Sequence, residues 1–167
     1  MLSRPATTNT PGAGLLRTPH FQTAYVTNDL ERACEVFRER YGVRAFQLLE
    51  SPLPSGGEVK LQLAWAGGVN LELIAASGAG AELYLDGLPA DRFAIRHHHF
   101  GYWVDDLPTW EALMAKIDRE GRRTPLRGHA EGFMRFCYVE APELGHYLEY
   151  ILADPAGVAF FENLPAT

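Results

Sequence analysis

Gln22–Leu30 reads QTAYVTNDL and His99–Leu107 reads HFGYWVDDL, and this repeated stretch decides the fold. The two copies align without a gap at an offset of 77 residues (99 minus 22). In each copy a strand-like segment leads into an Asp-Leu pair that begins a helical pattern. The identical pairs are Tyr25 and Tyr102, Asp29 and Asp106, and Leu30 and Leu107. The repeat indicates two similar halves.

A second repeated stretch keeps the same offset. Gly68–Ala76 (GVNLELIAA) aligns with Gly145–Ala153 (GHYLEYILA), again without a gap. The identical pairs include Gly68 and Gly145, Leu71 and Leu148, Glu72 and Glu149, and Ile74 and Ile151. Because both repeats share one offset, the chain between them is expected to fold in the same way in each half.

Each half is predicted to be βαβββ. The first helix is expected to be capped by Asn28 or Asp29 and the second by Asp105 or Asp106, and each carries an apolar stripe that ends at a glycine. The predicted strands are 21–26, 45–49, 59–65 and 70–75 in the first half and 99–104, 124–127, 133–139 and 147–152 in the second. The fold class is therefore α+β.

The predicted organisation is one domain at residues 20–152 between two tails. Module one covers 20–76, a connecting loop covers 77–96, and module two covers 97–152. Residues 1–19 are expected to form a flexible amino-terminal tail, and 153–167 a carboxyl-terminal tail with a short helix.

The bulk composition limits the partners. The chain has 167 residues, 47% of them hydrophobic, and a formal charge of −6, which argues against nucleic-acid or anionic-membrane binding. Four arginines between Arg119 and Arg127 form either a solvated helix end or a local anion pocket. The segment through Pro19 lacks a long apolar run, so no signal peptide or membrane span is expected, and the location is taken as cytoplasmic. A homodimer is left open.

The two cysteines do not indicate a disulfide framework or a zinc knuckle. Cys34 and Cys137 are far apart, and neither has a CxxC partner. Both lie in apolar patterns, so buried free thiols are predicted.

Four polar residues fall where strands should be apolar. Glu72 and Glu149 occupy equivalent positions, each 50 residues after another potential ligand (72 minus 22, and 149 minus 99). Those earlier residues are Gln22 and His99. An ionised carboxylate among apolar neighbours is costly to bury without a cation or strong donors. The four side chains are therefore a candidate metal site.

The double βαβββ pattern, with candidate ligands on the first and last strand of each module, resembles the vicinal oxygen chelate superfamily. This superfamily includes glyoxalase I, bleomycin-resistance proteins and extradiol dioxygenases. The resemblance covers residues 20–152 and implies two modules that form a cupped mixed sheet around a central cavity. It also implies the metal ligands Gln22, Glu72, His99 and Glu149, a set similar to that of zinc-type glyoxalase I. Zn, Ni, Co or Mn would suit these ligands.

The activity that this resemblance implies is that of a metal-dependent lyase or isomerase. The ion would chelate vicinal oxygens of a small organic molecule and stabilise an enediolate during proton transfer. Glu149 is the first candidate for the base, and Glu72 is the second. No glutathione-binding residues can be matched, which counts against a hemithioacetal substrate.

The neighbouring histidines extend the predicted site. Strand alternation places His97 on the face of His99 and His98 on the opposite face, and it places His20 on the face of Gln22, where His20 is an alternative ligand. The expected substrate-binding residues are His20, His97, Trp103 and Tyr147.

Two other functions remain open. If His20 replaced Gln22, then His20, His99 and Glu149 would form the Fe(II) triad of an extradiol-type dioxygenase. Alternatively, the protein binds a small molecule without catalysis, as resistance-type members do.

Overall fold

The computed structural model describes residues 18–167, so residues 1–17 of the expected flexible tail lie outside the described residues. Both halves fold as βαβββ. The first contains β1 (His20–Thr27), α1 (Leu30–Tyr41), β2 (Gln47–Pro52), β3 (Glu58–Ala66) and β4 (Val69–Ser77). The second contains β5 (Ile95–Trp103), α3 (Leu107–Arg119), β6 (Leu126–Ala130), β7 (Met134–Ala141) and β8 (His146–Ala153). The predicted α+β class and duplication are confirmed.

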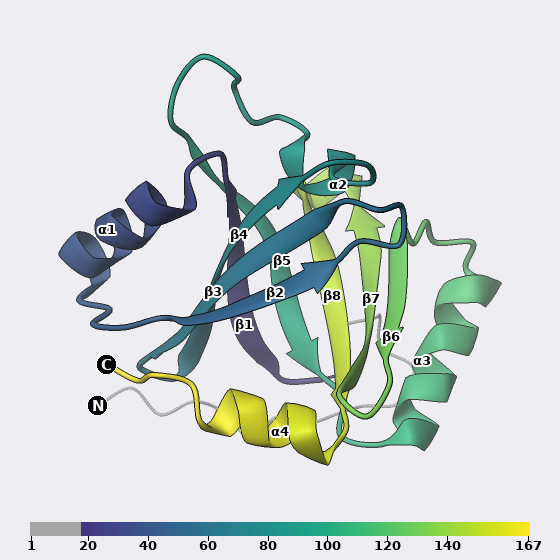
Figure 1. The fold of residues 1–167 in the computed structure, drawn as a ribbon. Coiled ribbons are helices and arrows are strands. Elements are labelled where there is room, and N and C mark those ends of the chain that lie inside the picture. Colours follow the sequence, from purple (N-terminus) through teal and green to yellow (C-terminus); the bar gives the residue numbers. More distant parts are fainter. Residues whose placement is uncertain (1–17) are drawn as a thin grey trace.

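All eight strands form one curled mixed sheet (Figure 1). Its order is β2-β3-β4-β1-β5-β8-β7-β6, so the two modules meet where β1 pairs with β5. The first and last strands of each module are parallel, and the remaining pairs are antiparallel. A parallel pair needs a long connection, which α1, α3 and the two outer strands of each module supply.

The register repeats the sequence offset. Ala24 pairs with Glu72 in module one, and Gly101 pairs with Glu149 in module two. Across the module boundary, Gln22 pairs with Gly101 and Ala24 with His99, so each pair is the 77-residue image of the other. This symmetry brings the first strands of both modules, with their candidate ligands, to the middle of the sheet.

The helices begin at the predicted caps. The Asp29 carboxylate accepts a hydrogen bond from Arg32 N at 3.0 Å, and the Asp106 carboxylate accepts one from Thr109 N at 2.7 Å. At the end of α1, Gly42 adopts the left-handed conformation, with φ of 70°, that favours glycine.

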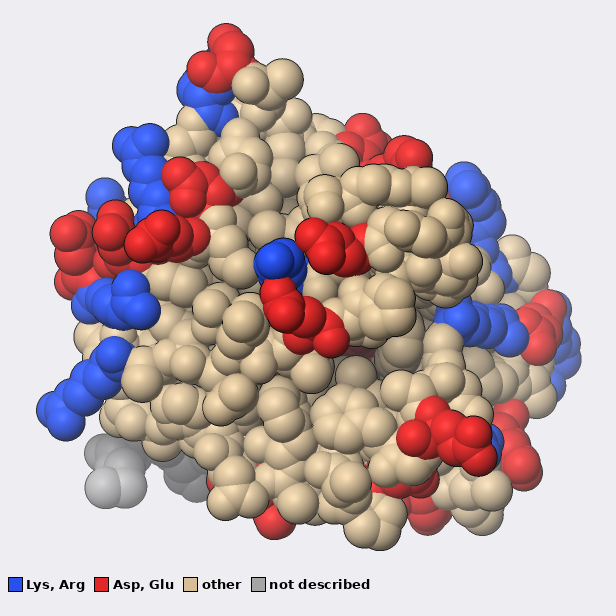
Figure 2. Space-filling model, in the orientation of Figure 1, with Lys and Arg blue, Asp and Glu red and all other residues tan. Residues whose placement is uncertain are grey.

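Charged side chains lie mainly over the flanks of the molecule. Figure 2 shows Lys and Arg gathered over α1 and α3, whereas the face over β2 and β3 is largely uncharged. One basic group near the middle of this face lies against acidic groups (Figure 2). Between the two strands, Lys60 Nζ of β3 pairs with Glu50 Oε1 of β2 at 2.9 Å.

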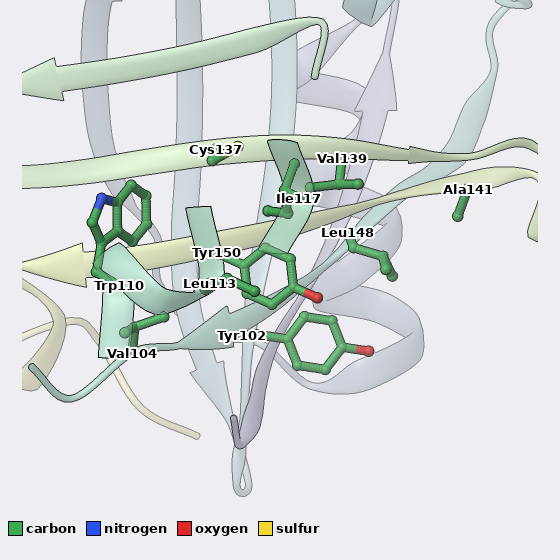
Figure 3. Packing of buried hydrophobic residues seen from close by; sticks show 10 residues of the cluster. All are labelled: Tyr102, Val104, Trp110, Leu113, Ile117, Cys137, Val139, Ala141, Leu148 and Tyr150. Atoms are coloured by element: carbon green, nitrogen blue, oxygen red, sulfur yellow. The ribbon is translucent and has the colours of Figure 1, made fainter. Parts of the chain in front are cut away.

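The two sheet faces have different coverings. On one face, α3 packs Trp110, Leu113 and Ile117 against Leu148 and Tyr150 of β8 (Figure 3). In the same way α1 packs against the apolar side chains of β4. Residues alternate along a strand, so Glu72 and Glu149 point away from these helices toward the opposite, concave face.

The carboxyl-terminal helix α4 (Pro155–Glu162) lies on the concave side. Phe161 packs with Leu63 and Ile151. Behind α4, the backbone N–H of Trp65 donates to Pro165 O at 2.7 Å, and Trp65 Nε1–H donates to Phe161 O at 2.8 Å. The last residues of the chain therefore join module one to module two.

Some boundaries differ from the sequence predictions. β2 and β6 begin two residues later than expected, and β5 begins four residues earlier, at Ile95. The short helix expected in the carboxyl-terminal tail is α4. The connecting loop contains an unpredicted helical turn, α2 (Glu82–Leu85). Both cysteines are buried free thiols, as predicted. No helix among residues 18–167 has the length and apolar character needed to cross a bilayer.

Candidate metal centre

Gln22, Glu72, His99 and Glu149 meet on the concave face of the sheet. They come from β1, β4, β5 and β8, which are neighbours in the order β4-β1-β5-β8. All four are nearly inaccessible to solvent, with exposed fractions of 0% for His99 and 6% or less for the others. Buried polar residues at this density need strong partners.

His99 Nε2 is the centre of the cluster. It lies 2.9 Å from Glu149 Oε2, 3.4 Å from Glu72 Oε2 and 3.3 Å from Gln22 Oε1. The ligating atoms of Glu72, His99 and Glu149 all lie within 4.8 Å of one another. Three oxygens and one nitrogen thus face a common point, and the set suits a hard or borderline divalent cation.

The electrostatics of the cluster fit a bound cation. Burial raises the pKa of Glu72, and the negative charge of Glu149 adds to this shift, against the opposing effect of His99. Burial alone would lower the pKa of His99, but Glu149 and Glu72 outweigh it and raise the pKa to about 9. Glu72 Oε2 has no hydrogen-bond partner among the described residues. A buried carboxylate oxygen without a donor is expensive, and a divalent cation would compensate it.

A hydrogen-bond chain orients Gln22. Ala64 O can only accept, so it receives Asn70 Nδ2–H at 3.3 Å, and Asn70 Oδ1 receives Gln22 Nε2–H at 3.0 Å. Gln22 Oε1 must then face His99 and the glutamates. Gly101 makes room for this side chain, because a Cβ there would lie 2.6 Å from Gln22 Oε1.

A second chain orients His99 and includes a residue that strand alternation placed wrongly. His98 is buried beside His99 on the concave side, with 2.8 Å between the two Nδ1 atoms, and its Nε2 lies 3.1 Å from Leu83 O. Leu83 O only accepts, so His98 Nε2 carries the proton. Burial, reinforced by His99, lowers the pKa of His98 to about 3, so the ring is neutral. His98 Nδ1 therefore accepts from His99 Nδ1–H, and His99 Nε2 is left to face the carboxylates.

A β-bulge explains the placement of His98. Ala24 pairs with His99 and Tyr25 with His97, so His98 is an extra residue in β5. On the other strand Phe21 is extra in the same way, between His20 and Gln22. Phe21 and His98 are themselves 77 residues apart (98 minus 21), so the bulge belongs to the duplication.

The bulges overturn two of the predicted site positions. His97 packs on Phe100 and Tyr25, and His20 packs on Phe100 and Tyr102, all away from the metal cluster. His20 is therefore not brought to the cluster as an alternative to Gln22. The triad of His20, His99 and Glu149 expected for an extradiol-type dioxygenase does not assemble.

The other two predicted substrate-binding residues lie near the chamber but do not line it. Trp103 packs behind Phe161, with ring centroids 5.6 Å apart. Tyr147 packs at a tilt against His98, with ring centroids 5.0 Å apart. It lines a groove beside the chamber, here called the outer groove, whose other walls come from 53–55, 78–86 and 125–127.

A chamber of about 280 Å³ lies directly over the cluster. Gln22, Glu72 and Glu149 line its polar side. Most of the remaining wall is apolar or aromatic and includes Leu61, Leu63, Phe133, Met134, Phe136, Ile151 and Phe161. Tyr84 of the unpredicted turn α2 also lines it, so this part of the connecting loop forms a wall of the chamber.

The two glutamates have different surroundings. A hydrogen bond between Glu149 and the Tyr138 hydroxyl contributes to a raised pKa of Tyr138, after burial and the charges of nearby groups. Glu149 also has the shorter contact with His99. Glu72 Oε2 lacks comparable partners among residues 18–167. Glu149 is thus the more firmly held of the two.

The arginines after α3 form ion pairs. Arg127 Nη2 lies 2.5 Å from Asp118 Oδ1, Arg123 pairs with Glu140 at 3.4 Å, and Arg122 pairs with Glu120 at 3.2 Å. Of these arginines, only Arg127 lines the outer groove, and none of them lines the chamber.

Comparisons with solved structures find related folds. Methylmalonyl-CoA epimerase from Mycobacterium tuberculosis superposes with a TM-score of 0.59 at 16% identity, covering 90% of this chain and 97% of that one. A Streptomyces coelicolor methylmalonyl-CoA epimerase variant in complex with 2-nitronate-propionyl-CoA gives 0.58 at 17% identity, covering 80% and 96%. A mutant 4-hydroxymandelate synthase from Streptomyces coelicolor gives 0.55 at 12% identity, covering 82% and 49%. These likenesses show a shared fold.

A comparison with curated protein sequences finds no match. Residues 21–138 match the profile of the family described as the Glyoxalase/Bleomycin resistance protein/Dioxygenase superfamily. This segment includes β1 through most of β7, and the two βαβββ modules have the corresponding architecture. The chain therefore belongs to the glyoxalase/bleomycin resistance protein/dioxygenase superfamily, the vicinal oxygen chelate superfamily.

Proposed function

We propose that this protein is a metal-dependent lyase or isomerase. It would remove and return a proton at the carbon atom next to a carbonyl group of a small organic molecule. The observation that carries the proposal is the convergence of Gln22 Oε1, Glu72, His99 Nε2 and Glu149 at one wall of the chamber. Zn, Ni, Co or Mn would be held by these four residues. When bound, the ion would take up two adjacent substrate oxygens and acidify the C–H bond between them.

The side chains of the cluster would have different roles in metal binding and proton transfer. Gln22 and His99 are fixed by their hydrogen-bond chains, and Tyr138 and His99 hold Glu149. Glu72 has a raised pKa, and its Oε2 at the chamber wall has only the longer, 3.4 Å contact with His99 and no hydrogen-bond donor among the described residues, which suits a general base. We therefore assign the proton acceptor to Glu72 and a fixed ligand role to Glu149, reversing the order of candidates taken from the sequence.

Two measurements test the function. Metal analysis of protein purified without added ions should find about one divalent ion per chain, and solvent deuterium should enter an α-hydroxyketone at the carbon bearing the hydroxyl. Glu72→Gln should keep most of the metal and slow this exchange by ~10²–10⁴-fold, the usual cost of losing a general base. Glu149→Gln should mainly weaken metal binding.

The matched control is Glu111→Gln, an exposed carboxylate on α3 that should change neither readout. Full exchange in Glu72→Gln together with slow exchange in metal-loaded Glu149→Gln would return the base role to Glu149. Absence of both metal and exchange in the unchanged protein would favour a non-catalytic binding protein.

A further inference from the structure

The walls of the chamber indicate what kind of molecule it accepts. Among the described residues, no Lys or Arg lines the chamber. Its charged lining residues are Glu50, Glu72 and Glu149. A substrate anion buried there would lack a cationic partner beyond the metal, at a large desolvation cost. The chamber therefore disfavours a phosphate or a second carboxylate on the substrate.

The outer groove beside the chamber does not supply the missing cations. This groove shares Leu53, Pro54 and Leu126 with the chamber and is lined by Glu82 and Asp86. Its one basic lining residue, within the part of the chain that the structure describes, is Arg127, which is paired with Asp118. An extended anionic carrier leaving the chamber would cross a surface with more carboxylates than free cations.

The remaining wall suits an apolar body about the size of one ring. Phe133, Phe136 and Phe161 contribute aromatic surface, and about 280 Å³ is at the small end of ligand pockets. The Phe136 ring lies against Gly128, where a Cβ would come within 2.1 Å of it, so the glycine leaves the room that the ring occupies beside β6. Aromatic side chains offer both faces and edges for packing against a ring.

We infer that the substrate is a small, uncharged molecule that carries its two adjacent oxygens on an apolar, ring-sized body, and that it is not an acyl-CoA or a phosphate ester. The inference rests on the proposed function for the chelating end of the molecule. It separates this protein from the neighbour solved with 2-nitronate-propionyl-CoA, although the two share a fold.

The test uses three α-hydroxyketones with the same chelating group. They are 2-hydroxyacetophenone, dihydroxyacetone and dihydroxyacetone phosphate, titrated calorimetrically into the zinc-loaded full-length protein. 2-Hydroxyacetophenone should bind about 10- to 100-fold more tightly than dihydroxyacetone, from burial of its ring. The phosphate ester should bind no more tightly than dihydroxyacetone.

Matched variants locate the preference. Phe136→Ala should weaken 2-hydroxyacetophenone by about 10-fold and leave dihydroxyacetone unchanged. Phe93→Ala is the control, because Phe93 is also half-buried but packs under Arg32, away from the chamber. It should alter neither affinity.

The failure of the inference and the failure of the proposed function are distinguishable. Equal affinities for the aryl and dihydroxy compounds, or a preference for the phosphate ester, would overturn the substrate class alone. Loss of metal binding, or of proton exchange with every compound, would count against the proposed reaction. In metal-free protein, acetophenone should still bind more tightly than phenyl phosphate, and the reverse order would overturn the inference without reference to any metal.

Discussion

At the scale of single residues, the site depends on two side chains that are not themselves candidate metal ligands. Asn70 and His98 each connect a ligand to a backbone carbonyl that can only accept a hydrogen bond. The carbonyls of Ala64 and Leu83 thereby determine which atoms of Gln22 and His99 face the chamber. Gln22 is thus oriented from within its own module, whereas His99 is oriented through the connecting loop, because Leu83 belongs to α2.

His98→Phe should weaken zinc binding by about 10- to 100-fold, the usual effect of removing a hydrogen-bond partner of a metal-bound histidine. The ring keeps its volume, but His99 Nδ1 loses its acceptor and the imidazole is no longer held in one tautomer. Competition with a zinc chelator measures the affinity, and ¹⁵N chemical shifts of His99 in metal-free protein report the tautomer.

His97→Phe is the control for this change, since His97 is the preceding residue and packs on the opposite face. His97 Nε2 contacts the backbone carbonyl of His99 at 3.1 Å and not the His99 ring, so zinc affinity and the ¹⁵N shifts of that ring should change little. If the two variants lost affinity equally, the effect would come from general disturbance of β5 and not from the hydrogen bond.

How much of the site is predictable from the sequence also depends on single residues. Gln22, Glu72, His99 and Glu149 could be selected because the duplication marks equivalent positions in two strands. His98 could not, because strict alternation assigns it to the wrong face. The repeated bulge at Phe21 and His98 has no separate signal in composition or spacing, since it depends on how β1 pairs with β5.

At the scale of elements, local signals predicted the helices better than the outer strands. Asp29 and Asp106 are caps whose hydrogen bonds are local, so α1 and α3 begin where the sequence indicates. β2 and β6 lie at the two edges of the sheet and begin two residues late. The central strand β5 begins four residues early, because Ile95 and Arg96 pair with Thr27 and Val26 of β1. The α2 turn is only four residues long and lacks a side-chain cap, so no cap signal announces it.

The helix α4, which contributes Phe161 to the chamber wall, makes one close backbone approach to the start of β7. A Cβ on Gly157 would lie 2.3 Å from Phe133 O, so only glycine lets the helix sit this near β7. Gly157→Ala should therefore push α4 outward and destabilise the protein by about 1–3 kcal/mol, despite the better helix propensity of alanine. Denaturant unfolding measures the loss.

The matched control for α4 is Gly68→Ala, where a Cβ would meet no atom within 4 Å and the backbone is not left-handed. Its effect on unfolding should stay within about 0.5 kcal/mol. A neutral or stabilising Gly157→Ala would show that α4 is not held against β7 in solution.

At the scale of the whole molecule, the buried cluster ties the stability of the fold to pH and to metal. In the metal-free protein the pKa of His99 is raised to about 9, against about 6.5 in an unfolded chain. The pKa of Glu72 is raised as well. Both shifts mean that the folded state binds protons more tightly than the unfolded state, so folding is favoured at the lower pH.

The free energy of unfolding of metal-free protein should therefore fall as the pH rises from about 6.5 to 9. His99 contributes fully below about 6.5, and its contribution, of order ~3 kcal/mol, is lost as the pH passes through about 9. Saturating zinc should reverse the slope, because protons compete with the metal for His99 and metal binding stabilises the folded state more at higher pH. Denaturant unfolding from pH 6.5 to 8.5, with EDTA and with zinc, measures both slopes. If the stability of the protein changed with pH in the same way with EDTA and with zinc, the metal would not compete with protons for His99. The assignment of His99 as a ligand would then be wrong.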